Sequence, residues 1–130
     1  MAVVLCTGTD LALMETRRLI LQEAGHKVVT AAKPPEIAAA CSKHAFDVAV
    51  IGQSISADSK RSDASLIRRH CPSAKILELY PANQHKIIED ADSWLEVPAE
   101  VPQELAQRVS RLANPEAKQL PRTKPIRRLD

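Results

Sequence analysis

The sequence predicts an α/β domain in which a five-stranded parallel sheet lies between two layers of helices. Short apolar runs alternate along the chain with segments whose apolar residues recur at helical spacing. Strands that alternate with helices in this way form parallel sheets that helices cover on both faces. The expected strands are 2–6, 27–31, 47–51, 75–80 and 93–97.

The first half of the chain supplies three of these strands and two helices. Residues 2–6 are apolar and are followed by Thr-Gly-Thr, a pattern typical of a buried strand that ends in a turn. Asp10 can cap the helix that follows, and Gly25 ends it. The proline pair at 34–35 begins a second helix, which continues through His44.

The second half continues the alternation after a polar interruption. Residues 53–62 are rich in serine, and we expect them to form a loop. A third helix begins at Asp63 and is ended by Pro72. A short helix-like segment then leads to Asp90, and Pro102 begins the last helix.

Composition excludes several classes of protein. The 130 residues carry a net charge of +2, too small a bias for a strongly basic nucleic-acid binder or an acidic disordered protein. No apolar run approaches the ~20 residues of a membrane span, and no signal peptide is recognisable. Cys6, Cys41 and Cys71 are odd in number and far apart, so we expect neither a disulfide nor a zinc site. We expect a reduced, cytoplasmic protein without a metal or cofactor.

The chain divides into a domain, 1–113, and a basic tail, 114–130. The tail carries five of the 18 lysine and arginine residues, together with several prolines and little apolar content. Prolines and mutually repelling charges favour an extended, mobile segment. No aromatic residue lies in the tail to stack on a base, so we expect no nucleic-acid partner for it, and none of the chain to enter a membrane.

Four segments, in this order and spacing, carry a resemblance to a known family. They are 23–31, 46–51, 66–72 and 91–98. Together they resemble the response-regulator receiver domain, the CheY-like family with a flavodoxin-like fold. The resemblance covers residues 2–113, and it implies the strand order 2-1-3-4-5.

The resemblance also implies a phosphorylation site, which this sequence does not complete. Receivers place an acidic pair for Mg²⁺ after strand one, a phosphoacceptor aspartate after strand three, a hydroxyl after strand four, and a lysine before a usually cis proline after strand five. The corresponding positions are, in that order, 7–9, Gly52, Tyr80 and Val97, and only the proline, Pro98, is retained. Glycine has no side chain to phosphorylate, and valine cannot pair with an acyl phosphate. We therefore interpret the chain as a degenerate pseudo-receiver, a non-catalytic signalling or interaction module that acts without phosphorylation.

Protein partners follow from the same resemblance. Receivers commonly dock through the face of the fourth helix, fifth strand and fifth helix, and we expect this face to bind a protein or a second copy of the chain. The candidate contact residues are Gln84, Ile88, Trp94, Glu104, Arg108 and Arg111. Trp94 occupies the position of the receiver's switching aromatic residue. Because bulky Tyr80 restricts its movement, we expect one dominant conformation with Trp94 partly exposed; a Trp94 buried in the core is the alternative.

Two further residues leave alternatives open. Cys6 precedes Thr-Gly-Thr, which resembles the phosphocysteine loop of sugar-transport IIB proteins and small phosphatases, so a Cys6 thiolate could serve an enzyme or phosphocarrier. A buried structural thiol is the other interpretation. Glu78 falls in an internal strand, where both faces are usually apolar. Its carboxylate needs a cationic partner, or it marks a ligand pocket.

Overall fold

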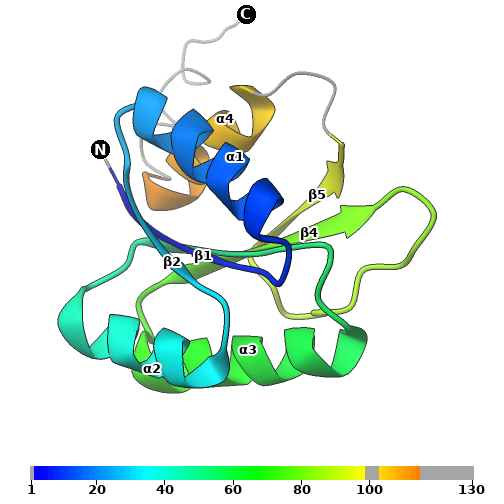
Figure 1. The fold of residues 1–130 in the computed structure, drawn as a ribbon, viewed down its shortest axis with the longest axis horizontal. Helices are drawn as coiled ribbons and strands as arrows, with labels where there is room; N and C mark the ends of the chain where they lie inside the picture. The colour runs from blue at the N-terminus through cyan, green and yellow to red at the C-terminus, as the bar shows by residue number, and fades with distance from the viewer. Residues whose placement is uncertain (1, 99–102, 115–130) are drawn as a thin grey trace, which may run out of the picture.

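Within residues 2–98 and 103–114, which the computed structural model describes, five strands form one parallel sheet through the middle of the molecule (Figure 1). The strand order is β2-β1-β3-β4-β5, which confirms the predicted order and the α/β class. The strands are β1 (Val3–Thr7), β2 (Lys27–Ala31), β3 (Val48–Ile51), β4 (Lys75–Pro81) and β5 (Ser93–Val97). The tail beyond residue 114 lies outside the described residues.

The helices of the described ranges cover the sheet on both faces (Figure 1). Helices α1 (Leu11–Glu23) and α4 (Gln103–Ala113) pack on one face, and α2 (Pro34–Lys43) and α3 (Ala57–His70) pack on the other. Successive residues of one strand point to opposite faces, so a strand covered on both faces, such as β3, is apolar at every position. In β3, for example, Val48 and Val50 face α1 and α4, whereas Ala49 and Ile51 face α2 and α3. No described helix combines the length and the apolar character that crossing a membrane requires.

Local signals set the ends of α1 as expected. The Asp10 carboxylate accepts a hydrogen bond from the Leu13 amide at 3.2 Å and so caps the first turn. After the last turn, Gly25 has φ of +96°, a conformation that a residue with a side chain adopts only with strain. These two residues confine the helix to the segment between the first two strands.

The loop predicted at 53–62 was wrong in its second half, because α3 begins at Ala57. Ser56 caps the helix by accepting a hydrogen bond from the Ser59 amide at 3.3 Å. The buried face of this first half carries Lys60 and Asp63 in place of apolar residues. The apolar periodicity that indicates a helix is therefore missing from a segment that is nevertheless helical.

The helix-like segment predicted before Asp90 was also wrong, because the described residues 82–92 contain turns and irregular backbone but no helix. Glu78 gives the physical reason. Its carboxylate accepts hydrogen bonds from the amides of Ile87, at 3.0 Å, and Ile88, at 2.8 Å. In a helix these two amides would donate to backbone carbonyls four residues earlier.

A disulfide joins Cys41, in α2, to Cys71, directly after α3, with a Cα–Cα distance of 5.7 Å. The sequence-based expectation of three reduced cysteines was therefore wrong. The two cysteines lie 30 residues apart in the chain, but α2 and α3 pack side by side on one face of the sheet (Figure 1). Cys6 is the free cysteine of the described residues.

Candidate functional site

The carboxyl ends of the strands meet at one edge of the sheet, where ligands bind in parallel α/β folds. β1 ends at Thr7 and β3 at Ile51, and these two residues are partners in the ladder. The Gly52 amide donates to the Thr7 carbonyl oxygen at 3.1 Å, which draws the two strand ends together. β4 and β5 end at the same edge, at Pro81 and Val97.

Gly52 occupies a position that has no room for a side chain. A Cβ atom there would lie 2.9 Å from the Thr7 carbonyl oxygen and 3.2 Å from Arg17 Nη1. The first distance is to backbone, which cannot move without disturbing β1. Close packing of the two strand ends therefore selects glycine here, independently of backbone conformation.

The variant G52A should lower the free energy of unfolding by about 1–3 kcal/mol, because the added methyl group overpacks a rigid site. Urea denaturation monitored by circular dichroism measures the change. G8A is the matched control: a Cβ on Gly8 would meet only the Met14 side chain, at 3.3 Å, and that flexible chain can move away. Equal stability of G52A and the wild-type protein would contradict the packing argument.

Arg17 brings a positive charge to this edge. Its side chain extends from α1, is 8% exposed, and donates from Nη2 to the amide oxygen of Gln53, one residue after Gly52. Burial lowers the pKa of the Arg17 guanidinium, while Cys6 and Asp10 act in the opposite direction. Arginine nevertheless stays protonated in proteins.

Arg17 was not among the residues predicted for this edge, although the sequence contains a signal for it. Arg17 lies four residues after Leu13 and four before Leu21, on the apolar stripe of α1. A single arginine on the buried face of a helix must place its charge against some partner. The partner that the structure shows is the side-chain amide of Gln53, which follows the end of β3.

Cys6 is not a nucleophile in this structure. It lies within β1, is 1% exposed, and packs in the core under α1 and α4. Burial raises the pKa of the thiol to about 12, and the opposing effect of Arg17 is smaller. The thiol is therefore protonated and enclosed at neutral pH, so the alternative of a Cys6 phosphocarrier or phosphatase was wrong.

Glu78 pairs with a cation, as one of the two sequence-based interpretations required. Lys60 Nζ lies 2.8 Å from Glu78 Oε2 and donates also to the Leu79 carbonyl oxygen at 2.9 Å. Lys60 is 2% exposed and Glu78 0%. With the amides of Ile87 and Ile88 on the same carboxylate, the hydrogen-bonding capacity of Glu78 is used within the fold. The pair is thus structural, since both charges have partners among the described residues.

A groove of about 470 Å³ runs along the outer strand, and we call it the β5 groove. Its lining residues are Tyr80, Trp94, Leu95, Glu96, Pro98, Glu104 and Arg108. Tyr80 and Trp94 are both half-buried, and Lys86 Nζ lies 5.7 Å and 5.0 Å from the centres of their rings. Trp94 Nε1 donates to the Ile88 carbonyl oxygen at 3.0 Å, which fixes the indole orientation. The groove thus has two residues with ordered aromatic rings among its lining, which is otherwise mostly polar and carries charges of both signs.

Comparison with known proteins shows which fold this is. No protein-family model matches the chain, and no curated protein sequence is detectably similar. Among solved structures, chemotaxis protein CheY4 of Vibrio cholerae is 24% identical, with a TM-score of 0.73 over 86% of this chain and 98% of that chain. Response regulator TrrA of Thermotoga maritima is also 24% identical, with a TM-score of 0.70 over 86% and 99%. A CheY-like receiver domain protein of Methanospirillum hungatei is 17% identical, with a TM-score of 0.74 over 92% and 98%.

The chain has the CheY-like receiver fold. The docking face predicted from the sequence includes a fourth helix before the last strand. In the structure, residues 82–92 occupy that place and form no helix. Of the predicted contact residues, Gln84 and Arg111 are exposed, and Trp94, Glu104 and Arg108 are half-buried. Ile88 is 3% exposed and packs in the core under α3, so its assignment to the face was wrong. The Val97–Pro98 peptide bond at the edge of the groove is cis.

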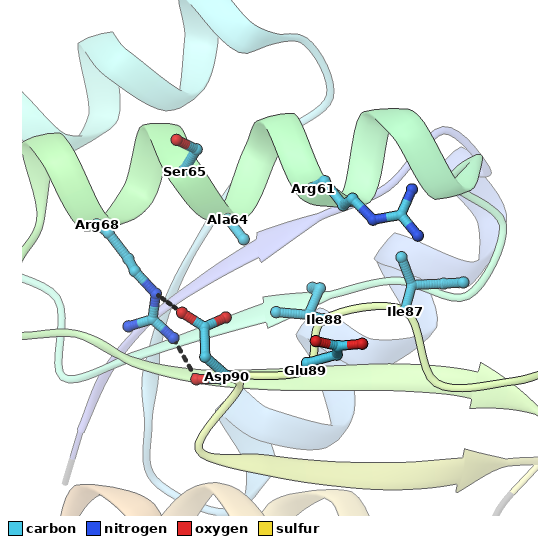
Figure 2. A pocket seen from close by; sticks show the side chains of 8 residues that line it. All are labelled: Arg61, Ala64, Ser65, Arg68, Ile87, Ile88, Glu89 and Asp90. Carbon is cyan, nitrogen blue, oxygen red and sulfur yellow. Dashed lines mark hydrogen bonds and ion pairs between the residues drawn. The ribbon is translucent and has the colours of Figure 1, made fainter.

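A second hollow, of about 430 Å³, lies between α3 and residues 87–90 of the receiver fold (Figure 2). Figure 2 shows Arg68 reaching across it to Asp90, with 3.2 Å between Arg68 Nε and the carboxylate. Arg61 and Glu89 place further opposite charges on its two sides. Because the charges largely compensate each other, this hollow offers a ligand less electrostatic attraction than the Arg17 edge does.

Proposed function

We propose that this chain is a pseudo-receiver, a non-catalytic signalling module that binds a protein partner and accepts no phosphoryl group. The buried Arg17 guanidinium beside Gly52 is the observation that supports the proposal most strongly. It places a fixed positive charge at the edge where the receiver resemblance implies a metal ion and a phosphorylated aspartate. Gly52 has space for no side chain, and so for no acceptor.

The residues at this edge do not fit Mg²⁺. Magnesium binds oxygen ligands, usually with at least one carboxylate among them. Thr7 ends β1, Gly8 and Thr9 follow it, and none of the three supplies a carboxylate; the Asp10 carboxylate caps α1. The Arg17 charge would also repel a divalent cation. TrrA, by contrast, was solved in complex with Mg²⁺ and BeF.

Acetyl phosphate and Mg²⁺ should therefore leave the intact mass of the protein unchanged, because the phosphoacceptor position holds glycine. Intact-mass spectrometry measures this, with TrrA as a positive control treated in parallel. Beryllofluoride and Mg²⁺ should likewise leave the fluorescence emission of Trp94, the one tryptophan of the chain, unchanged. Gain of one hydroxylamine-labile phosphate, or a shift of the Trp94 emission, would contradict the proposal.

The β5 groove is the surface that we assign to the partner. Half-buried aromatic rings often contribute a large share of binding energy, and Tyr80 and Trp94 are both held in place before a partner arrives. Glu96 offers negative charge on the groove wall, whereas Glu104 pairs with Arg108 at 3.8 Å, and Arg108 donates inward to Ser93 Oγ and the Trp94 carbonyl oxygen. These features favour a protein partner, or a second copy, that brings a basic group to Glu96.

W94A should reduce the recovery of a specific partner about tenfold or more. The test compares proteins co-purified with tagged full-length wild type and W94A, quantified by mass spectrometry and accompanied by circular dichroism of each variant. Because Trp94 also packs against the core, E96A provides a second groove variant that leaves packing intact. L19A is the control, since Leu19 is an exposed apolar residue of α1 outside the groove. Equal recovery with all four proteins would show that the groove is not the docking surface.

A further inference from the structure

Arg17 is a buried cation without an anionic partner among the described residues. None of the ion pairs within residues 2–98 and 103–114 includes it, and its hydrogen bond goes to the neutral amide of Gln53. Asp10 acts on the Arg17 charge, but its carboxylate accepts from the Leu13 amide. Buried charges in proteins are normally paired, because removal from water is otherwise uncompensated. Within the described part of the chain, the element missing at Arg17 is therefore a negative charge.

The guanidinium is nevertheless open to a small molecule. Arginine has five N–H donors on three nitrogens, and within residues 2–98 and 103–114 the one hydrogen bond that Arg17 makes comes from Nη2. Arg17 also lines a cavity, so part of its side chain faces open space. A ligand can reach the donors that the protein leaves unused.

The space beside Arg17 is a cavity of about 260 Å³ between α1, β5 and α4, which we call the Arg17 cavity. Most of its lining is apolar and comes from these three elements: Leu13, Ile20, Leu95, Val97 and Leu105. Arg17 supplies its charge, and Gln53 and Thr16 supply its other polar groups. Such a combination, an apolar lining with a few converging polar groups, is typical of small-molecule sites.

The topology singles out the position of the guanidinium, whereas most of the cavity lining comes from α1, β5 and α4. In a sheet ordered β2-β1-β3-β4-β5, successive connections change direction between β1 and β3, and ligands bind at the carboxyl end of that switch point. Arg17 Nη1 lies 3.2 Å from the position of a Cβ on Gly52, the residue directly after β3. The unpaired cation thus lies at the crevice that the fold itself creates.

We propose that the Arg17 cavity binds a small organic carboxylate, with the anionic end on Arg17 and an apolar body between α1 and α4. The planar guanidinium matches a carboxylate through two parallel hydrogen bonds. One positive charge balances one negative charge, and an apolar lining supplies few donors for a dianion such as phosphate. The cavity is slightly smaller than most small-molecule pockets, which suits a body about as large as one aromatic ring.

Phenylacetate and its neutral isostere phenylacetamide test the proposal on the wild-type protein. We expect phenylacetate to cause saturable ¹⁵N–¹H shifts at the Gly52 and Gln53 amides, and phenylacetamide to bind about tenfold more weakly or not at all. The variant R17Q should lose the response to phenylacetate. R18Q, which removes a neighbouring charge from the outer side of α1, should keep it.

Several outcomes would overturn the proposal. Equal responses to the acid and the amide would show that Arg17 does not select charge, and this comparison holds even if R17Q fails to fold. The proposal would also be wrong if the wild type showed no saturable shift, if R17Q responded as the wild type does, or if inorganic phosphate bound more tightly than phenylacetate.

Glu100 lies in the four residues between β5 and α4 that the structure does not describe. Binding of phenylacetate to E100Q but not to the wild type would assign the Arg17 charge to the chain's own carboxylate and exclude a free ligand.

Discussion

Replacing Lys60 with methionine should lower the free energy of unfolding by about 3–5 kcal/mol. The substitution keeps most of the side-chain volume but leaves the fully buried Glu78 carboxylate without its cation. Urea denaturation at neutral pH measures the loss. A buried pair contributes little net stability compared with apolar residues, so the large effect comes from the charge that remains unpaired.

Two matched variants separate this explanation from a general intolerance of α3 to substitution. R61M changes the adjacent residue, whose ion pair with Asp58 is long, at 3.6 Å, and exposed, so we expect a loss below about 1 kcal/mol. K60M/E78Q removes both charges and leaves an amide oxygen for the Ile87 and Ile88 amides, so it should recover much of the stability lost in K60M. A double variant no more stable than K60M would show that unpaired charge is not the cause.

Reduction of the Cys41–Cys71 disulfide should destabilise the protein by about 2–4 kcal/mol. The bridge connects positions 30 residues apart and limits the conformations of the unfolded chain. Thermal unfolding with and without a phosphine reductant measures the effect as a lower Tm. The reduced wild-type protein and the C41S/C71S variant should then melt at similar temperatures.

C6S is the control for this experiment. Cys6 is enclosed in the core and takes no part in the bridge, so the Tm of C6S should respond to the reductant as the wild-type Tm does. A wild-type Tm that is independent of reductant would mean that the bridge does not form or does not constrain the unfolded chain.

The fold could be predicted because a strand that is buried on both faces has a continuous apolar sequence. Residues 48–51 form an uninterrupted apolar run, and such runs indicate a parallel sheet wherever helical segments separate them. The first half of α3 could not be predicted, since Lys60 replaces an apolar residue on its buried face. Its partner Glu78 lies 18 residues away, and the spacing of apolar residues within one helix cannot indicate such a pairing.

The candidate site was predicted less completely for the same reason. Gly52 and Trp94 could be located from their positions relative to the strands: Gly52 directly follows β3, and Trp94 lies within β5. Arg17 and the disulfide depend instead on which side chains meet in three dimensions. Ile88 was misassigned because a helix was expected where the backbone amides bind a carboxylate.

The attachment of residues 87–88 to Glu78 determines how the segment between β4 and β5 can open. A helix in that place would fray one turn at a time, each step exposing a few backbone groups. Here two consecutive amides share one carboxylate, so residues 87 and 88 are released together. Because Trp94 donates to the Ile88 carbonyl oxygen, the indole loses this hydrogen bond in the same event. The order of the Trp94 ring in the β5 groove therefore depends on the buried Glu78 carboxylate, although Glu78 does not touch that ring through any hydrogen bond of its own.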